Sequence, residues 1–311
     1  MKLETNPVRA SRSKNTCPPC PELDDPAFPV GLLRDFGWSH SLGLGIENDA
    51  LSIENDQLIA QSFSILNAQL PRYGPPVVES FAATPANRPW IIHLAEGTDA
   101  VAEAELALLD MLGCLRANTV LVHGAGLRAA DMEHVIECGA AVVWCPSSNV
   151  SMLGRTLDPR RLFDAGRLAL GSDSRLTGAR DLLDELRAAA AHSDLSPREL
   201  LRLVTVDASR VLALPNAGGL APRQHADLLI LRDTGADPHQ SLLDITRDEV
   251  CAVVRSGVPA IADRDLAEWF AAYGVETAPV MLDRRPKLMA KELARPDAIA
   301  LEAGLELLVG R

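Results

Sequence analysis

Two ionisable side chains directly follow an apolar run near residue 90. In WIIHLAEG, which begins at Trp90, the run ends at His93, and Glu96 stands three residues further on. An imidazole and a carboxylate at the end of a buried strand cost free energy unless they face a cleft, are paired or bind a metal. The same groups serve as metal ligands and as acid–base catalysts. The rest of the sequence narrows this choice.

Similar polar endings follow three further apolar runs. His123 ends VLVH, the segment CPSSN with Ser147, Ser148 and Asn149 follows AAVVW, and Asp173 lies in LGSDS after GRLAL. A strand-end histidine by itself is more often structural, and an Asp after Gly-Ser more often marks a turn or a helix cap. Four such endings in succession favour a common site.

Helical stretches separate these apolar runs, so the elements that position the polar residues can be predicted. Ala- and Leu-rich or amphipathic patterns indicate helices over 99–113, 127–139, around 157–166, over 179–192 and over 196–212. Alternation of buried strands and helices predicts βαβ units and a parallel sheet. The carboxyl ends of parallel strands share one edge, which is where such folds build active sites.

The remaining pattern is less regular. Residues 28–38 suggest a strand, 53–70 a helix, and the segments with YGPP and TPANRP a loop. Strands joined by a loop are expected in 225–232 and 249–263. We predict a poorly ordered segment over 1–28, a partial β/α barrel carrying the site over 29–215, a small β segment over 216–264 and a partly helical tail over 265–311.

The motifs IIHLAEG, VLVHG, VVWCPSSNVSML and ALGSDS, in this order, resemble the second half of an amidohydrolase-superfamily barrel. The likeness is strongest to the branch with cytosine and guanine deaminases and chlorotriazine hydrolases. GGLAPRQHADLLIL resembles the exit from that barrel into a small β-sandwich. The resemblance implies an α/β fold of the (β/α)8 barrel type, incomplete at its N-terminal side, with a remnant of the sandwich.

Roles for the candidate residues follow from that resemblance. It implies that His93, His123 and Asp173 bind one Zn²⁺ or Fe²⁺, that Glu96 moves the proton of the reacting water, and that His123 and Asp173 also take part in catalysis. Ser147, Ser148 and Asn149 are expected to shape their turn and to contact neighbouring backbone. The implied reaction is hydrolysis of a non-peptide C–N bond, as in deaminases, in a small cyclic or amide-like molecule.

Composition limits the partners. The formal net charge is −12, which disfavours binding to nucleic acid or to an anionic membrane surface. No apolar run approaches the roughly 20 residues of a membrane span, and the first residues lack a signal-peptide core, so we expect a cytoplasmic protein acting on a small molecule. Of the six cysteines, only Cys17 and Cys20 have motif spacing, and an exposed turn is the preferred interpretation of CPPC.

One family feature is absent. The family's barrel begins with an HxH pair that supplies two metal ligands, and no HxH occurs among the seven histidines. His40 is a weak substitute, and His134, His192, His225 and His239 are expected to be solvated or to cap helices. Two interpretations stay open: an incomplete metal-dependent hydrolase, or a non-catalytic relative that pairs with itself or with a complementary half-barrel chain. A third, the zinc deaminase fold with HxE followed by PCxxC, is excluded because the chain has HxxE and its CPPC precedes it.

Overall fold

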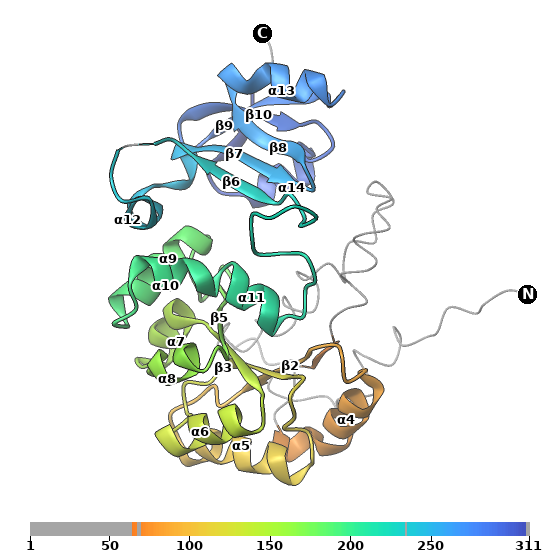
Figure 1. Cartoon of the computed structure of the whole chain (residues 1–311), viewed down its shortest axis with the longest axis vertical. Coiled ribbons are helices and arrows are strands. Elements are labelled where there is room, and N and C mark those ends of the chain that lie inside the picture. The colour runs from red at the N-terminus through yellow and green to blue at the C-terminus, as the bar shows by residue number, and fades with distance from the viewer. Residues whose placement is uncertain (1–63, 67–69, 234, 309–311) are drawn as a thin grey trace, which may run out of the picture. The chain divides into compact units, whose positions relative to one another are not determined.

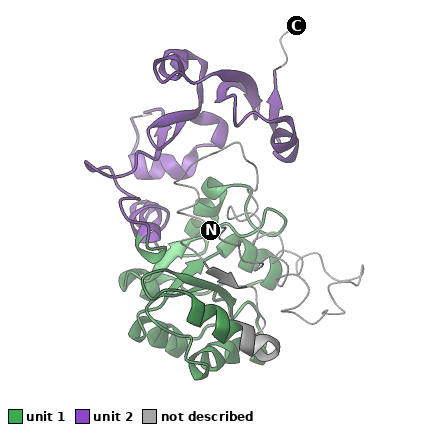
Figure 2. Ribbon diagram, turned by 90° about the vertical axis from the view of Figure 1, so that its right-hand side faces the viewer, with its two compact units in different colours: residues 1–194, 210–213 green, residues 195–209, 214–311 purple. Residues whose placement is uncertain are grey.

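The computed structural model describes residues 64–66, 70–233 and 235–308 (Figure 1). The predicted strand at 28–38 and segment 1–28, together with Cys17, Cys20 and His40, lie outside the described residues. Two compact units are present (Figure 2). The first runs to Asp194 and also holds Arg210–Ala213, and the second holds Leu195–Ser209 and the residues from Leu214 onward.

A five-stranded parallel sheet forms the centre of the first unit. Its strands lie in the order in which they occur in the chain, each hydrogen-bonded to the next. Every residue of the second to fifth strands is buried, which explains their continuous apolar runs. Among the described strands the sheet is open. The strands are β1 (Ser64–Leu66), β2 (Trp90–Leu94), β3 (Thr119–His123), β4 (Ala141–Trp144) and β5 (Leu168–Leu170).

Helices follow each strand, and those after β2, β3 and β5 lie where the sequence predicts them. Several begin at residues whose side chains cap them: Asp99 Oδ1 accepts from the Ala102 amide at 2.9 Å, and Asp181 Oδ1 accepts from Leu183 and Asp184, each at 3.0 Å. The helices are α4 (Leu70–Ala83), α5 (Ala100–Met111), α6 (Ala129–Glu137), α7 (Pro146–Leu153), α8 (Arg160–Asp164) and α9 (Leu182–Ala191).

The segment before residue 90 differs from the prediction. Part of the helix expected over 53–70 is the strand β1, and the expected YGPP loop lies within α4. Packing explains the helix: Val77 is fully buried, and the Phe81 ring meets Trp90 edge-on with centroids 5.1 Å apart. These contacts outweigh the local preference of the prolines.

An antiparallel six-stranded sheet dominates the second unit, in the order β11-β9-β10-β8-β7-β6. Three of its strands lie beyond residue 264, where the sequence suggests a partly helical tail. The elements are α10 (Pro197–Leu203), α11 (Val206–Val211, which runs into the first unit), β6 (Leu228–Leu231), α12 (Pro238–Asp244), η2 (Arg247–Glu249), β7 (Val250–Arg255), β8 (Val258–Asp263), η3 (Arg264–Leu266), α13 (Ala267–Ala272), β9 (Thr277–Leu282), β10 (Arg285–Ala290), α14 (Pro296–Leu301) and β11 (Leu305–Leu307).

The hairpin between β9 and β10 shows why this part of the sheet was missed. Leu282 pairs with Arg285, so the turn has two residues, Asp283 and Arg284. Both have positive φ, 44° and 81°, as in a type I′ turn. Such turns usually contain Asn-Gly or Asp-Gly, which makes them recognisable in a sequence, whereas this turn contains no glycine.

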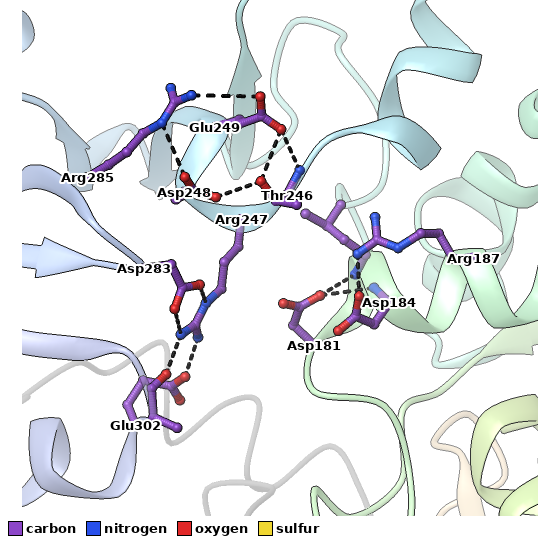
Figure 3. Close-up of polar contacts among 12 residues, drawn as sticks. Asp181, Asp184, Arg187, Thr246, Arg247, Asp248, Glu249, Asp283, Arg285 and Glu302 are labelled. Atoms are coloured by element: carbon purple, nitrogen blue, oxygen red, sulfur yellow. Dashed lines mark hydrogen bonds and ion pairs between the residues drawn. The ribbon is translucent and has the colours of Figure 1, made fainter.

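Arg247 fixes that hairpin turn to the rest of the second unit (Figure 3). Its Nε and Nη2 donate to the two Asp283 carboxylate oxygens at 2.5 and 3.1 Å, and it also contacts Glu302 and the Ala303 carbonyl. The hydrogen bonds to Asp283 raise the pKa of the Arg247 guanidinium. This side chain therefore joins three segments that are distant in sequence.

Replacing Arg247 with alanine should lower the free energy of unfolding by about 2–3 kcal/mol, because a two-pronged, mostly buried ionic contact is lost. Arg285→Ala is the matched control, since Arg285 is half-exposed and pairs with Asp248 at 3.2 Å. An exposed pair contributes only about 0–1 kcal/mol. Urea denaturation measures both. Equal losses would show that the Arg247 contacts do not stabilise the hairpin.

Within the described residues, no helix is long and apolar enough to cross a membrane.

Candidate active site at the carboxyl ends of the parallel strands

His93 and His123 come from neighbouring strands and lie against each other. Their rings are stacked, with centroids 5.4 Å apart and an interplanar angle of 29°. Both side chains are buried, at 6% and 0% exposed. His123 Nε2 lies 3.5 Å from Glu96 Oε2. The structure thus brings together three of the four principal residues that the sequence nominated.

Backbone geometry turns these strand ends away from regular β-structure. His123 has φ 77°, and the Gly124 amide bonds to the Val122 carbonyl at 3.2 Å, which is the pattern of a γ-turn. Ala95, between His93 and Glu96, has φ 52°, and Asp173 also has φ 52°. Left-handed residues other than glycine are strained and cluster at functional sites. His123 and Asp173 have such backbone themselves, and Glu96 directly follows Ala95.

Asn149 sets the orientation and tautomer of His123. Its Nδ2 donates to the His123 carbonyl at 3.2 Å and to Thr156 Oγ1 at 3.1 Å, so its Oδ1 is the acceptor for His123 Nδ1 at 3.0 Å. A neutral His123 then carries its proton on Nδ1 and its lone pair on Nε2, facing Glu96. A lone pair and a carboxylate oxygen 3.5 Å apart repel each other unless a proton or a cation lies between them.

Asp173 is held by hydroxyl groups. Ser148 Oγ donates to Asp173 Oδ2, and Thr177 Oγ1 donates to the same oxygen at 3.2 Å. The loop around it is tight: a Cβ on Gly178 would lie 2.0 Å from the Ser172 carbonyl oxygen, so only glycine fits there. Because Ser148 adjoins Asn149, a continuous chain of contacts runs from His93 through His123 to Asp173.

The structure corrects the prediction for the CPSSN segment. The expected turn is the first part of helix α7, which begins at Pro146. Asn149 does contact neighbouring backbone, as expected, but all three residues also bond to side chains: Ser147 to Glu185, Ser148 to Asp173 and Asn149 to His123. Ser148 and Asn149 therefore contact two of the candidate residues directly.

Glu185 is a component that the sequence prediction missed. This α9 carboxylate is fully buried and accepts from the Ser147 amide at 3.0 Å and from the Ser147 hydroxyl. Burial raises the pKa of Glu185, although hydrogen bonds from Ser147 and the Ala179 amide oppose the shift. In the sequence, Glu185 resembles any polar residue of an amphipathic helix. No local signal marked it.

The distances between donor atoms show which residues are spaced like the ligands of one metal ion. Histidine nitrogens and carboxylate oxygens bound to one zinc lie about 2.0–2.2 Å from it, so they lie within a few Å of each other. His93, His123 and Asp173 do not form a trio with all donor atoms within 4.8 Å. Among the described residues, Asp110, His134 and Cys138 form the one such group. We call His93, Glu96, His123 and Asp173, at the carboxyl ends of the parallel strands, the rim. The rim has the donor types and the fixed His123 tautomer of a metal site, but its donor atoms lie further apart than ligands of one ion do.

Curated proteins that are similar to the chain include deaminases. The chain is 29% identical over 162 residues to a 5-methylthioadenosine/S-adenosylhomocysteine deaminase of Pyrococcus furiosus, covering 47% of this chain and 38% of the relative. It is 29% identical over 170 residues to an 8-oxoguanine deaminase of Pseudomonas aeruginosa, covering 50% and 38%. The chain thus spans well under half the length of these curated relatives.

Solved structures show the same fold. A variant of the atrazine chlorohydrolase of Arthrobacter aurescens, complexed with zinc and atraton, matches with a TM-score of 0.55 and 24% identity over 68% of this chain and 54% of that one. An adenosine deaminase of Xanthomonas campestris with bound zinc matches with a TM-score of 0.52 and 24% identity over 67% and 54%. The model of the amidohydrolase family matches residues 77–260, more than half of the chain. The predicted resemblance is confirmed: the chain belongs to the amidohydrolase family.

Proposed function

We propose that the chain is a metal-dependent hydrolase that cleaves a non-peptide C–N bond, as deaminases do, in a small cyclic or amide-like molecule. The relatives named above include deaminases of adenine- and guanine-type compounds. The supporting observation is the pair formed by His123 Nε2 and Glu96 Oε2, buried, 3.5 Å apart and oriented by Asn149. Two such acceptors facing each other suit a site for a cation and a mobile proton.

The donor types suit the proposed ion. His93, His123 and Asp173 would hold it once their donor atoms, which are not all within 4.8 Å of one another here, draw together. Imidazole with carboxylate is compatible with Zn²⁺ or Fe²⁺. A divalent cation, when bound, lowers the pKa of a water molecule toward about 7. The solved relatives with zinc support this choice of ion.

The chain's own residues would then have distinct tasks. Asn149 keeps the His123 lone pair directed at the rim. Ser148 and Thr177 hold the Asp173 carboxylate. Glu96 would take a proton from the attacking water and deliver it to the leaving nitrogen, which is general acid–base catalysis. We also propose that β1 to β5 are part of a (β/α)8 barrel of the family type.

The direct test measures metal content and ammonia release for the purified full chain with a panel of aminopurines, aminopyrimidines and their nucleosides. Bound zinc or iron with turnover supports the hydrolase. A metal-free, inactive oligomer would overturn it and favour the non-catalytic partner role that the sequence leaves open.

Changing Glu96 to glutamine separates proton transfer from metal binding. We expect metal content to stay the same and turnover to fall by about 10²- to 10⁴-fold, the usual contribution of a general acid–base group. Glu79→Gln, at an exposed position of α4, is the control and should match the parent. Unchanged turnover in Glu96→Gln would remove Glu96 from the mechanism.

A further inference from the structure

A second group of metal-binding side chains lies between α5 and α6, on elements that carry none of the rim residues. Asp110 comes from the last turn of α5, His134 from α6, and Cys138 from the residue that ends α6. One donor atom from each lies within 4.8 Å of the other two. The two helices are labelled in the lower part of Figure 1.

Helix geometry explains why these residues meet. His134 and Cys138 are four residues apart and therefore share one face of the helix end. His134 Nε2 lies 2.9 Å from Asp110 Oδ2, and Cys138 Sγ lies 3.8 Å from His134 Nε2. Glu137 Oε2, 3.9 Å from His134 Nδ1, adds a further oxygen nearby.

These separations are near those of ligands on one tetrahedral ion. Zinc binds nitrogen and oxygen at about 2.0–2.2 Å and sulfur at about 2.3 Å, which places pairs of its ligands about 3.3–3.6 Å apart. The observed nitrogen–oxygen pair is slightly closer and the nitrogen–sulfur pair slightly wider.

We propose that Asp110, His134 and Cys138 form a binding site for a thiophilic divalent cation, Zn²⁺ in particular, separate from the rim. A thiolate and an imidazole favour zinc over Mg²⁺ or Ca²⁺, which take oxygen ligands. Three protein ligands leave one position for water. The His134 and Asp110 side chains are 41% and 42% exposed, so the ion can exchange with solvent.

The thiol must lose its proton when the ion binds. Without an ion, burial and the carboxylates of Asp110 and Glu137 raise the pKa of Cys138, while Arg116 opposes the shift. A zinc ion displaces this proton, so affinity should rise with pH.

Cobalt absorption tests the site through its sulfur ligand. In the full chain carrying Cys17→Ser and Cys20→Ser, added Co²⁺ should give a sulfur-to-cobalt charge-transfer band. Cys138→Ser should abolish the band, and Cys114→Ala, which alters a buried thiol elsewhere, should keep it. His134→Gln should weaken Zn²⁺ binding in a chelator competition by at least about 10-fold.

The rim does not enter this readout, because its proposed ligands contain no sulfur. Asp173→Asn should therefore keep the cobalt band even if the proposed hydrolase activity fails. Absence of the band in the parent, or a band that survives Cys138→Ser in protein with an unchanged circular dichroism spectrum, would overturn the proposal.

Discussion

Asparagine in place of Asp173 should remove the metal of the proposed hydrolase and its turnover together. The substitution keeps the size of the side chain and an oxygen that accepts from Ser148 and Thr177. Asparagine also tolerates the left-handed backbone, here at φ 52°. The negative charge that attracts the ion is lost. One acid–base group supplies about 10²- to 10⁴-fold in rate, and turnover should fall by at least this factor.

Two variants make this result specific. Asp164→Asn changes a half-exposed carboxylate of the same unit and should leave metal content and turnover unchanged. Ser148→Ala removes one hydrogen bond to Asp173 and should keep the ion while lowering turnover less than Asp173→Asn does. Elemental analysis and an ammonia assay provide both readouts. If Asp173→Asn retained its metal and full activity, Asp173 would have no place in the site.

Alanine at Glu185 should be among the most destabilising single changes in the first unit. The change removes the carboxylate that accepts from the Ser147 amide, the Ser147 hydroxyl and the Ala179 amide. These three donors then lack their acceptor inside the protein, and a cavity forms beside them. Each buried unsatisfied group costs about 1–3 kcal/mol, so we expect a total loss of about 3–5 kcal/mol. Chemical denaturation measures it. Glu79→Ala, on an exposed face, should change stability by about 0.5 kcal/mol or less.

Glutamine at the same position reveals the protonation of Glu185. Its folded-state pKa is raised, so the folded chain holds this proton more tightly than the unfolded chain, where the pKa is about 4.3. The resulting stabilisation is complete below pH about 4.3 and is lost as the pH rises through the folded-state value. The unfolding free energy of the wild type minus that of Glu185→Gln should therefore fall with rising pH. A constant difference would show that Glu185 does not titrate abnormally.

The sequence predicted β2 to β5 well because their residues are buried on both faces and form uninterrupted apolar runs. Polar residues that end such runs must reach the same edge, which is why His93, Glu96 and His123 could be nominated together and are found in contact. Asp173 was nominated by the same logic, and a helix that the sequence did not suggest, α7, links it to the histidines.

What escaped prediction depends on contacts between distant elements. Glu185 and Ser147 are 38 residues apart, and neither position has a local pattern that indicates a buried carboxylate. His134 was expected to be solvated or to cap a helix; its side chain is 41% exposed, but its contact with Asp110 on another helix was not foreseen. The β9–β10 turn lacks the glycine that normally marks its type. Helix α4 forms although its prolines disfavour a helix locally, because Val77 is buried against the rest of the unit.

The left-handed backbone at Ala95, His123 and Asp173 restricts which amino acids mutation can bring to this edge of the sheet. Valine, isoleucine and threonine are sterically penalised there whatever their chemistry, whereas asparagine, aspartate, histidine and glycine are accepted. Three of these four carry groups that bind cations or protons. The main chain alone thus favours, at these positions, residues whose side chains can bind cations or protons.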